Sequence, residues 1–252
     1  MTLLSLQNLT VKRGECPVVD AASLSIGPGE CVGLIGPNGA GKTSLLRGAL
    51  GLLPSDGISS LAALPPRKRA AQAAWLPQTR EIAWPMSVER IVALGRLPYL
   101  ARGASLSETD QTAVDAALAR MGLQNYRQRL ATALSGGEQA RVLIARTLAQ
   151  DTPLLMADEP IAGLDPAAQI ATLQVFETLA KEGRAVLTSL HDLSLAGRYC
   201  TRLILMGAGQ IIADGPPRDV LTPRMLAEVF HLKADVLDTP QGPIVQPLGV
   251  LT

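Results

Sequence analysis

The sequence has few of the residues that mark secreted, zinc-bound or membrane-spanning proteins. Its 252 residues include three cysteines, Cys16, Cys31 and Cys200. They are too few and too scattered for a disulfide framework or a zinc site, which indicates a reducing cytosol. No apolar run approaches the roughly 18 residues that span a bilayer. The N-terminus also lacks the basic start and apolar core of a signal peptide.

Excess charge, aromatic residues and repeats are also scarce. Lysine and arginine number 23 against 22 acidic residues, and the net charge of +1 gives no support for nucleic-acid binding. Aromatic residues make up 3% of the chain, and none precedes Trp75. A composition of 47% hydrophobic and 18% charged residues is typical of a folded globular protein.

One short segment is rich in glycine and predicts a phosphate-binding loop. It consists of Gly36, Pro37, Asn38, Gly39, Ala40, Gly41, Lys42 and Thr43, followed by Ser44. The pattern G-x-x-x-x-G-K-[ST] wraps phosphate oxygens in backbone N–H groups. Lys42 should reach the terminal phosphates, and the Thr43 hydroxyl should ligate Mg²⁺. A turn that only caps a helix is the alternative, but lysine and threonine directly after the last glycine argue against it.

Continuous apolar runs predict buried parallel strands on either side of polar residues. Val32–Ile35 stops at the glycine-rich loop, and a helix is expected to follow over Thr43–Leu53. Leu154–Ala157 and Ala185–Leu190 are further apolar runs, as expected for strands covered on both faces. Polar residues that follow such strands lie where open α/β sheets bind their ligands.

Two acidic residues follow the strand at Leu154–Ala157. Asp158 suits a carboxylate that holds Mg²⁺, directly or through water. Glu159 would orient or deprotonate an attacking water. The alternative is a pair of strand-end acids that cap the next segment, which the glycine-rich loop upstream makes the weaker interpretation.

Leu134-Ser135-Gly136-Gly137-Glu138 has two compatible interpretations. Ser135 and Glu138 have the spacing of a capping box at an ordinary helix start. The same helix end exposes N–H groups and a positive dipole to an anion. The glycines would allow phosphate to approach. The interval to Asp158 is long enough for one helix and one strand.

Helical patterns fill the region between the glycine-rich loop and Asp158. Ser107–Met121 reads as a helix with Ser107 as its cap, and a second helix should cover about 137–150. Near the end of the chain, Arg202–Met206 and Gln210–Ala213 predict a hairpin, and Thr222 caps a short helix.

Taken together, these motifs resemble the ATP-binding-cassette ATPases from about Leu3 to Phe230. The resemblance implies an α/β P-loop NTPase core with a parallel sheet, an antiparallel β subdomain and an inserted α-helical subdomain. It implies a nucleotide-binding domain over residues 1–232, a helical subdomain at about 87–150 and a short C-terminal tail at 233–252.

The same resemblance implies ATP and Mg²⁺ as cofactors and gives roles to further residues. Gln78 would touch Mg²⁺ and water, and His191 would contact the γ-phosphate and hold Glu159. Ser135 and Gly137 would complete the site of a second copy in a head-to-tail dimer. Asp165, in Gly163-Leu164-Asp165, would belong to the loop that couples the two sites.

Two departures from the family pattern stand out. The family often has an aromatic residue that stacks on adenine, whereas this chain has Arg13, whose guanidinium plane could stack instead. The segment from Ser55 to Ser60 also looks shorter than the family's usual hairpin.

Within the family, Trp84–Val88 and Val92–Tyr99 resemble the ATPases of importers for iron-siderophores, haem and cobalamin. The resemblance implies membrane permease subunits as partners, an external substrate-binding protein acting through them, and a peripheral location at the cytoplasmic face of the inner (plasma) membrane. If the protein serves transport, another chain must form the channel. The alternatives are a soluble assembly ATPase of the Fe–S or DNA-repair kind and an exporter half.

Overall fold

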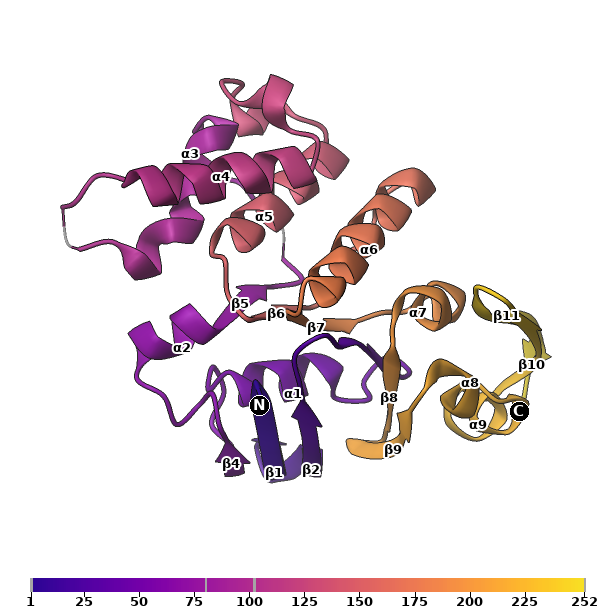
Figure 1. Cartoon of the computed structure of the whole chain (residues 1–252). Helices are drawn as coiled ribbons and strands as arrows, with labels where there is room; N and C mark the ends of the chain where they lie inside the picture. The colour runs from indigo at the N-terminus through magenta and orange to yellow at the C-terminus, as the bar shows by residue number, and fades with distance from the viewer. Residues whose placement is uncertain (1, 80, 102, 252) are drawn as a thin grey trace.

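The centre of the molecule is a six-stranded sheet with the order β5-β6-β7-β3-β8-β9 (Figure 1). The structure is a computed structural model that describes residues 2–79, 81–101 and 103–251. The strands are β3 (Cys31–Ile35), β5 (Ala73–Leu76), β6 (Leu154–Ala157), β7 (Ala185–Ser189), β8 (Arg202–Gly207) and β9 (Gln210–Gly215). The first five strands in the sheet order run parallel, and β9 is antiparallel to β8.

Both faces of this sheet are buried, which explains its continuous apolar runs. In β6, Leu155 and Ala157 join the core on the side of the longer helices, and Leu154 and Met156 join the core on the other side. On that second side, α1 (Lys42–Ala49) lies between the parallel sheet and a three-stranded antiparallel sheet (Figure 1). The antiparallel sheet has the order β2-β1-β4 and consists of β1 (Leu4–Arg13), β2 (Cys16–Ile26) and β4 (Asp56–Ser59).

A helical region lies between β5 and β6 in the chain and stands above the sheet in Figure 1. Its elements are α3 (Val88–Ala93), η1 (Leu94–Tyr99), α4 (Glu108–Arg120), η2 (Gln124–Tyr126), η3 (Ala131–Ala133) and α5 (Gly136–Ala149). Ser107 caps α4 and Ser135 caps α5, each in a complete capping box. Both predicted helices and both predicted caps are therefore confirmed.

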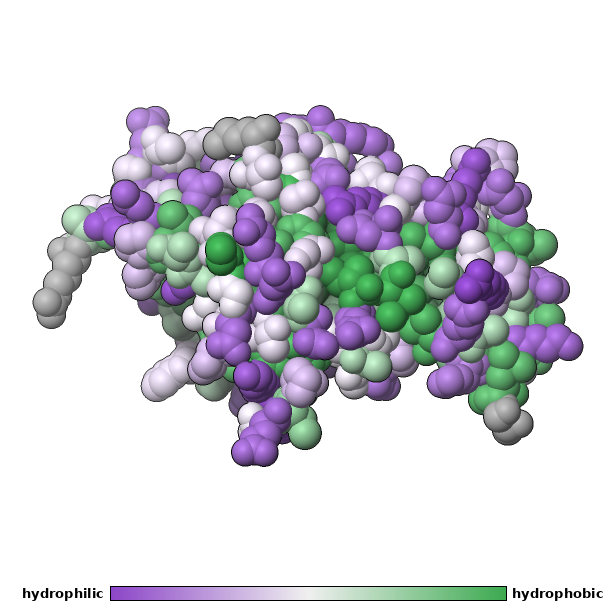
Figure 2. Space-filling view, turned by 90° about the horizontal axis from the view of Figure 1, so that it is seen from below, coloured by the Kyte–Doolittle hydropathy of each residue, from purple (hydrophilic) through white to green (hydrophobic). Residues whose placement is uncertain are grey.

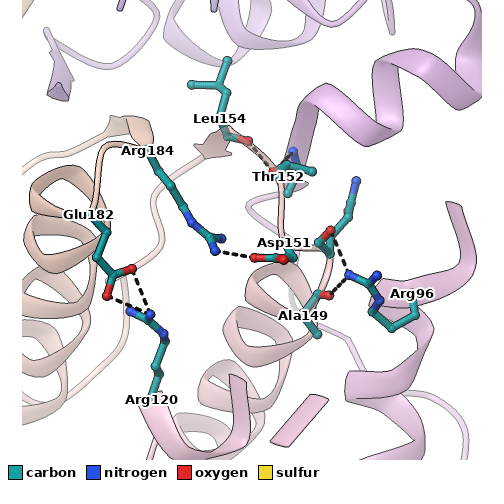
Figure 3. A network of polar contacts seen from close by, with 10 residues as sticks. Arg96, Arg120, Ala149, Asp151, Thr152, Leu154, Glu182 and Arg184 are labelled. Atoms are coloured by element: carbon teal, nitrogen blue, oxygen red, sulfur yellow. Dashed lines mark hydrogen bonds and ion pairs between the residues drawn. The ribbon is translucent and has the colours of Figure 1, made fainter. Parts of the chain in front are cut away.

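Ion pairs join the helical region to the parallel core (Figure 3). Arg120 at the end of α4 donates from Nη2 to both carboxylate oxygens of Glu182, each at 2.8 Å. Arg184, just before β7, pairs with Asp151 between α5 and β6. These contacts tie the far ends of α4 and α5 to the segment that precedes β7.

Arg96 holds the helical region together from within. Its Nε donates to Asp110 Oδ1 at 2.8 Å. Its Nη1 donates to the Ala149 carbonyl at 2.9 Å, as Figure 3 shows. Gly95 beside it lies so close to α5 that a Cβ would stand 2.2 Å from the Arg146 carbonyl oxygen. Gly95 and Arg96 of the Leu-Gly-Arg-x-Pro run therefore join η1, α4 and α5.

The remaining helices are α2 (Pro66–Gln72), α6 (Pro166–Lys181), α7 (Leu193–Tyr199), α8 (Pro217–Val220) and α9 (Pro223–Phe230). Residues beyond His231 form a hairpin of β10 (Leu232–Thr239) and β11 (Gly242–Val250), with β11 packed on α7. Figure 2, seen from below, shows apolar side chains gathered on the side where Figure 1 places β9 and this hairpin. The exposed apolar side chains of these elements include Ile212, Leu237, Ile244, Leu248 and Val250.

The α/β fold class predicted from the sequence is confirmed, as are the hairpin β8–β9 and the Thr222 cap of α9. The predicted helix over Thr43–Leu53 is too long: α1 ends at Ala49, and Gly51 adopts a φ of 63°. In the segment expected as a short hairpin, β4 is a single strand paired with β1. None of the helices in the described parts of the chain has the length and apolarity to span a bilayer.

Candidate functional site

The polar segments that the sequence singled out converge at one edge of the parallel sheet. The glycine-rich loop leaves β3, Gln78 follows β5, Asp158 and Glu159 follow β6, and His191 follows β7. Since these strands are parallel neighbours, their carboxyl ends share an edge. The strand order therefore assembles the site from segments that are far apart in the sequence.

The glycine-rich loop has a backbone shape that its glycines make possible. Gly41 has a φ of 98°, and a Cβ there would stand 2.3 Å from the Val18 carbonyl oxygen. Gly36 is similarly crowded, with a Cβ position 2.3 Å from the Met206 carbonyl oxygen. These two glycines are required by the packing of the chain itself.

Lys42 lies against the loop that precedes it. Its Nζ donates to the Gly36 carbonyl at 2.7 Å and to the Pro37 carbonyl at 3.0 Å. Burial lowers the pKa of Lys42 from its ordinary value, and the nearby Glu159 and Asp158 carboxylates oppose this shift. The ammonium group is thus held within the loop, near the two acids.

A hollow of about 510 Å³ opens over this loop. Its lining is formed by Val11, Lys12, Arg13, Val18, Asn38, Gly39, Ala40, Gly41, Lys42, Thr43, Ser44, Arg47, Leu53 and Glu159. Backbone N–H groups and four arginine or lysine side chains in its lining suit an anionic ligand, and its aliphatic walls suit a flat organic group. The hollow therefore has the chemistry of a nucleotide site, and Arg13, which was expected to be able to stack on the base, lies in its wall.

The acidic pair after β6 is tied to the neighbouring strand. Asp158 is almost fully buried, and its Oδ1 accepts a hydrogen bond of 2.7 Å from the Ser189 hydroxyl. The same Ser189 oxygen accepts a bond of 2.8 Å from the backbone N–H of Glu159. Glu159 has a left-handed φ of 49°, an unusual conformation for a residue with a side chain.

The Glu159 carboxylate lies between His191, which was predicted to hold it, and Gln78, which was predicted to touch Mg²⁺ and water. Its Oε1 is 2.6 Å from His191 Nε2, and its Oε2 accepts a bond of 2.9 Å from Gln78 Nε2. Burial raises the pKa of Glu159, but His191, Gln78 and Lys42 together outweigh burial and lower the pKa below its ordinary value. The side chain is therefore a held, ionised carboxylate at the edge of the hollow.

The donor set fits Mg²⁺ in its chemistry. Thr43 offers a hydroxyl, Asp158 a carboxylate and Gln78 an amide oxygen, and hard oxygen ligands of this kind suit Mg²⁺. In the described part of the chain, no three His, Cys, Asp or Glu side chains gather as a metal cluster. Few protein ligands are expected where substrate phosphates and water complete the shell of Mg²⁺.

Ser135 lies in a second hollow, of about 630 Å³, away from the glycine-rich loop. Its lining includes Ser135, Gly137, Glu138, Arg141 and Asp165, and none of its lining residues also lines the first hollow. Asp165 caps α6 through a 2.9 Å bond from the Ala168 N–H. The resemblance assigned Ser135 to the nucleotide of a second copy and Asp165 to the loop that couples two sites, and the fold places both residues in a different hollow from Lys42.

The two glycines after Ser135 are not required by the packing of this chain. Apart from its own helix, the described part of the chain puts no atom within 4 Å of a Cβ built on Gly136. At Gly137 the nearest such atom is a Leu164 methyl at an ordinary 3.9 Å. No close contact within the described part of the chain therefore requires glycine at either position.

Comparison with known proteins agrees with the geometry of the first hollow. The family model described as "ABC transporter" matches residues 19–162, which contain the glycine-rich loop, Ser135 and both acids. The chain belongs to the ABC transporter family.

Two curated relatives show how far the ABC similarity extends. The hemin import ATP-binding protein HmuV of Pseudomonas entomophila is 42% identical, with 98% of each chain covered. The cobalamin import ATP-binding protein BtuD of Halobacterium salinarum is 40% identical over 92% of this chain. The chain spans 60% of the length of that relative.

A solved ABC structure confirms the fold. It is an inward-facing transporter described as of the metal-chelate type, with a TM-score of 0.85 and 25% identity. The match covers 99% of this chain and 98% of the other. The ABC cassette fold predicted from the motifs is therefore confirmed along nearly the whole chain.

The structure brings some predicted site residues of this ABC cassette together and separates others. The loop 36–44, Gln78, Asp158, Glu159 and His191 converge at one edge, whereas Ser135, Gly136, Gly137 and Asp165 belong to the second hollow or its rim. Sequence reasoning missed Ser189 and Arg47. A serine at the end of an apolar strand was the available signal for Ser189.

Proposed function

We propose that the chain is the ATP-hydrolysing subunit of an ABC importer, with Mg-ATP as its substrate at an interface between two copies of the chain. The observation that carries this proposal is the Glu159 carboxylate held between His191 and Gln78, beside Lys42 and the phosphate-binding loop. A held, ionised carboxylate next to a triphosphate site is the arrangement that hydrolysis by water requires.

Each group in the first hollow has a defined task in this proposal. The N–H groups of loop 36–44 bind phosphate oxygens, and Lys42 turns from its carbonyl partners to the terminal phosphates. Thr43, Asp158 and Gln78 would hold Mg²⁺, which offsets phosphate charge when bound. Glu159 orients or deprotonates the attacking water, while His191 and Gln78 fix its carboxylate.

Two copies are required because the chain divides its phosphate-binding groups between two hollows. Ser135 and Gly137 present a helix N-terminus to the second hollow, away from Lys42 of the same chain. The open space over Gly136 is explained when a phosphate of another copy's nucleotide approaches there. A head-to-tail pair, coupled through Asp165, gives each nucleotide both sets of groups.

The names of the relatives and the exposed residues of the helical region support an importer. Trp84 and Leu97, in the runs that resemble importer ATPases, are 74% and 59% exposed. We infer that this surface binds a membrane permease subunit, that an external binding protein delivers the solute, and that the chain is peripheral at the cytoplasmic face of the membrane. The solute class is a metal chelate: an iron-siderophore, haem or cobalamin.

The proposal treats residues 1–232 as the nucleotide-binding domain, with 87–150 as the helical subdomain that meets the permease. The tail at 233–252 holds most of the hairpin, whose strand β11 packs on α7, the helix that starts after His191. The two ion pairs in Figure 3 would transmit motion between the helical subdomain and the core.

The substitution Glu159→Gln tests the hydrolytic assignment. We expect ATP binding to be retained and steady-state hydrolysis to fall by about 10²- to 10⁴-fold, since the amide cannot accept a proton from water. We also expect the variant to form a stable ATP-bound dimer on size-exclusion chromatography. Hydrolysis at the wild-type rate would refute the role of Glu159.

Co-purification separates the importer from a soluble assembly ATPase. The importer subunit should be recovered in detergent with a multi-span membrane protein and lose it when Leu97 is changed to Glu. Recovery without any membrane protein, from cells that carry the neighbouring genes, would contradict the importer proposal. It would leave the test of Glu159 unaffected.

A further inference from the structure

The Ser189 hydroxyl joins the two acidic residues of the site from a different strand. Ser189 is the last residue of β7 and is completely buried. We propose that Ser189 is a positioning residue for ATP hydrolysis, which sets Asp158 and Glu159 in their working geometry. This inference rests on the proposed hydrolytic function of the same site.

The Ser189 hydroxyl takes part in two hydrogen bonds, one as donor and one as acceptor. It donates to Asp158 Oδ1 at 2.7 Å and accepts from the Glu159 backbone N–H at 2.8 Å. Both partners come from the turn that follows β6, the strand paired with β7. One hydroxyl therefore fixes the side chain of one acid and the backbone of the next.

The hydrogen bond to Ser189 stabilises an unusual backbone conformation at Glu159. Its φ of 49° lies in the left-handed region, which a residue with a side chain adopts only when surrounding contacts hold it there. The direction of the Glu159 side chain depends on that backbone angle. The bond to Ser189 thus contributes to aiming the carboxylate at His191 and Gln78.

The Asp158 carboxylate also needs a partner that defines its rotation. It is 1% exposed, and a charge-assisted bond from a buried hydroxyl holds one of its oxygens in place. Partners of this kind orient metal-binding carboxylates, and their loss typically costs about 10- to 100-fold in metal affinity or activity. Removal of the Ser189 hydroxyl should therefore affect both the metal and the catalytic carboxylate.

Thr188 offers a matched control one residue away. It is also completely buried in β7, and its Oγ1 has no hydrogen-bond partner in the described part of the chain. Thr188→Val removes a hydroxyl from the same strand without removing a bond to either acid. An effect of Ser189→Ala that Thr188→Val does not share is specific to the bridging hydroxyl.

The experiment compares wild type, Ser189→Ala, Ser189→Thr, Thr188→Val and Glu159→Gln as full-length chains. Hydrolysis gives kcat and KM, and a fluorescent ATP analogue gives Kd with and without Mg²⁺. For Ser189→Ala we expect kcat to fall about 10- to 100-fold, an unchanged Kd without Mg²⁺, and a smaller gain in affinity from Mg²⁺. Ser189→Thr keeps the hydroxyl and should recover part of kcat, and Thr188→Val should match wild type.

Three results would overturn the inference. The first is a wild-type kcat in Ser189→Ala, and the second is a loss of kcat in Thr188→Val as large as that in Ser189→Ala. The third is a loss of ATP affinity in Ser189→Ala that is as large without Mg²⁺ as with it. The last two would indicate a general disturbance of β7. An inactive wild type would instead refute the proposed function. An active wild type with an inactive Glu159→Gln variant and a fully active Ser189→Ala variant would refute only the role of Ser189.

Discussion

The hollow at the glycine-rich loop and the hollow at Ser135 differ in how their glycines contact the rest of the chain. In the first, Gly36 and Gly41 are required by close contacts within the chain, and Lys42 is hydrogen-bonded to the loop itself. In the second, Gly136 meets open space and Ser135 is exposed. In the proposed function, the first hollow binds the nucleotide of its own chain, and the second is one face of a site that a second copy would complete.

This difference separates a motif whose glycines are required by contacts within the chain from a motif whose glycines are not. A glycine that avoids a clash within the chain would be retained in an isolated monomer. A helical glycine with no such clash lowers the stability of the monomer. The second hollow is therefore the better place to test whether two copies act together.

The largest effect that separates the two hollows is expected from Ser135→Arg. A long cationic side chain would occupy the space over Gly136 and block a second copy's nucleotide. Turnover should fall by about 100-fold or more, because groups that stabilise the transferring phosphate are lost. ATP binding to the monomer, measured with a fluorescent analogue, should remain at the wild-type value.

Ser107→Arg is the control, because Ser107 caps α4 in a capping box of the same kind. Loss of either cap costs about 1 kcal/mol of stability, so both variants should show a similar fall in Tm. Only Ser135→Arg should lose turnover. If both variants lose turnover equally, or if Ser135→Arg no longer binds ATP, the two-copy site is wrong.

Local patterns in the sequence predicted the parts of the site that lie within one segment. The loop 36–44, the Ser135 capping box and the acids at 158–159 were visible because strand, loop and helix signals adjoin them. Ser189 was missed because its role depends on the pairing of β6 with β7, which no local pattern reveals. The end of α1 at Ala49 was missed because Leu50 and the residues after it are as apolar as the helix itself.

The helical region gives a second example of this limit. Gly95 and Arg96 were read as part of a run typical of importers, but their contacts are with Ala149, Asp110 and Arg146, far along the chain. A buried arginine is explained only when its partners are known, since an unpaired buried charge is strongly unfavourable. Arg96 could be singled out in the sequence, but its buried contacts became visible only from the packing of η1 against α5.

A smaller effect is expected from Arg13→Ala, which tests the base end of the first hollow. Arg13 is exposed in the hollow wall, where many relatives are expected to have an aromatic ring. A guanidinium stacks on any base, so we expect ATP and GTP to bind wild type with similar Kd values. Arg13→Ala should weaken both by about 2- to 5-fold, the range of an exposed cation–π contact.

Arg13→Tyr sharpens this test because it restores a ring at the same position. It should recover ATP binding in a competition titration, while Lys181→Ala, which breaks the exposed ion pair with Glu177 on α6, should change Kd little. An unchanged Kd in Arg13→Ala, or a strong preference of wild type for ATP, would show that another group recognises the base.

The smallest effect on turnover is expected at the capping box of α4, the counterpart of the box at Ser135. Hydrogen bonds from Ser107, followed by Arg96, lower the pKa of Asp110 to about 2. Because the folded-state pKa lies below the unfolded value of about 3.9, the ionised carboxylate stabilises the fold above that value. The stabilisation is lost as pH falls through 2.

Asp110→Asn should therefore lower Tm at pH 7, and the difference from wild type should shrink between about pH 4 and pH 2. Glu108→Gln is the control, since Glu108 lies in the same first turn of α4 but is exposed. A Tm difference that stays constant with pH would assign the effect to shape and neutral hydrogen bonding. Unchanged ATP turnover at pH 7 would show that this capping box, unlike the one at Ser135, serves only the fold.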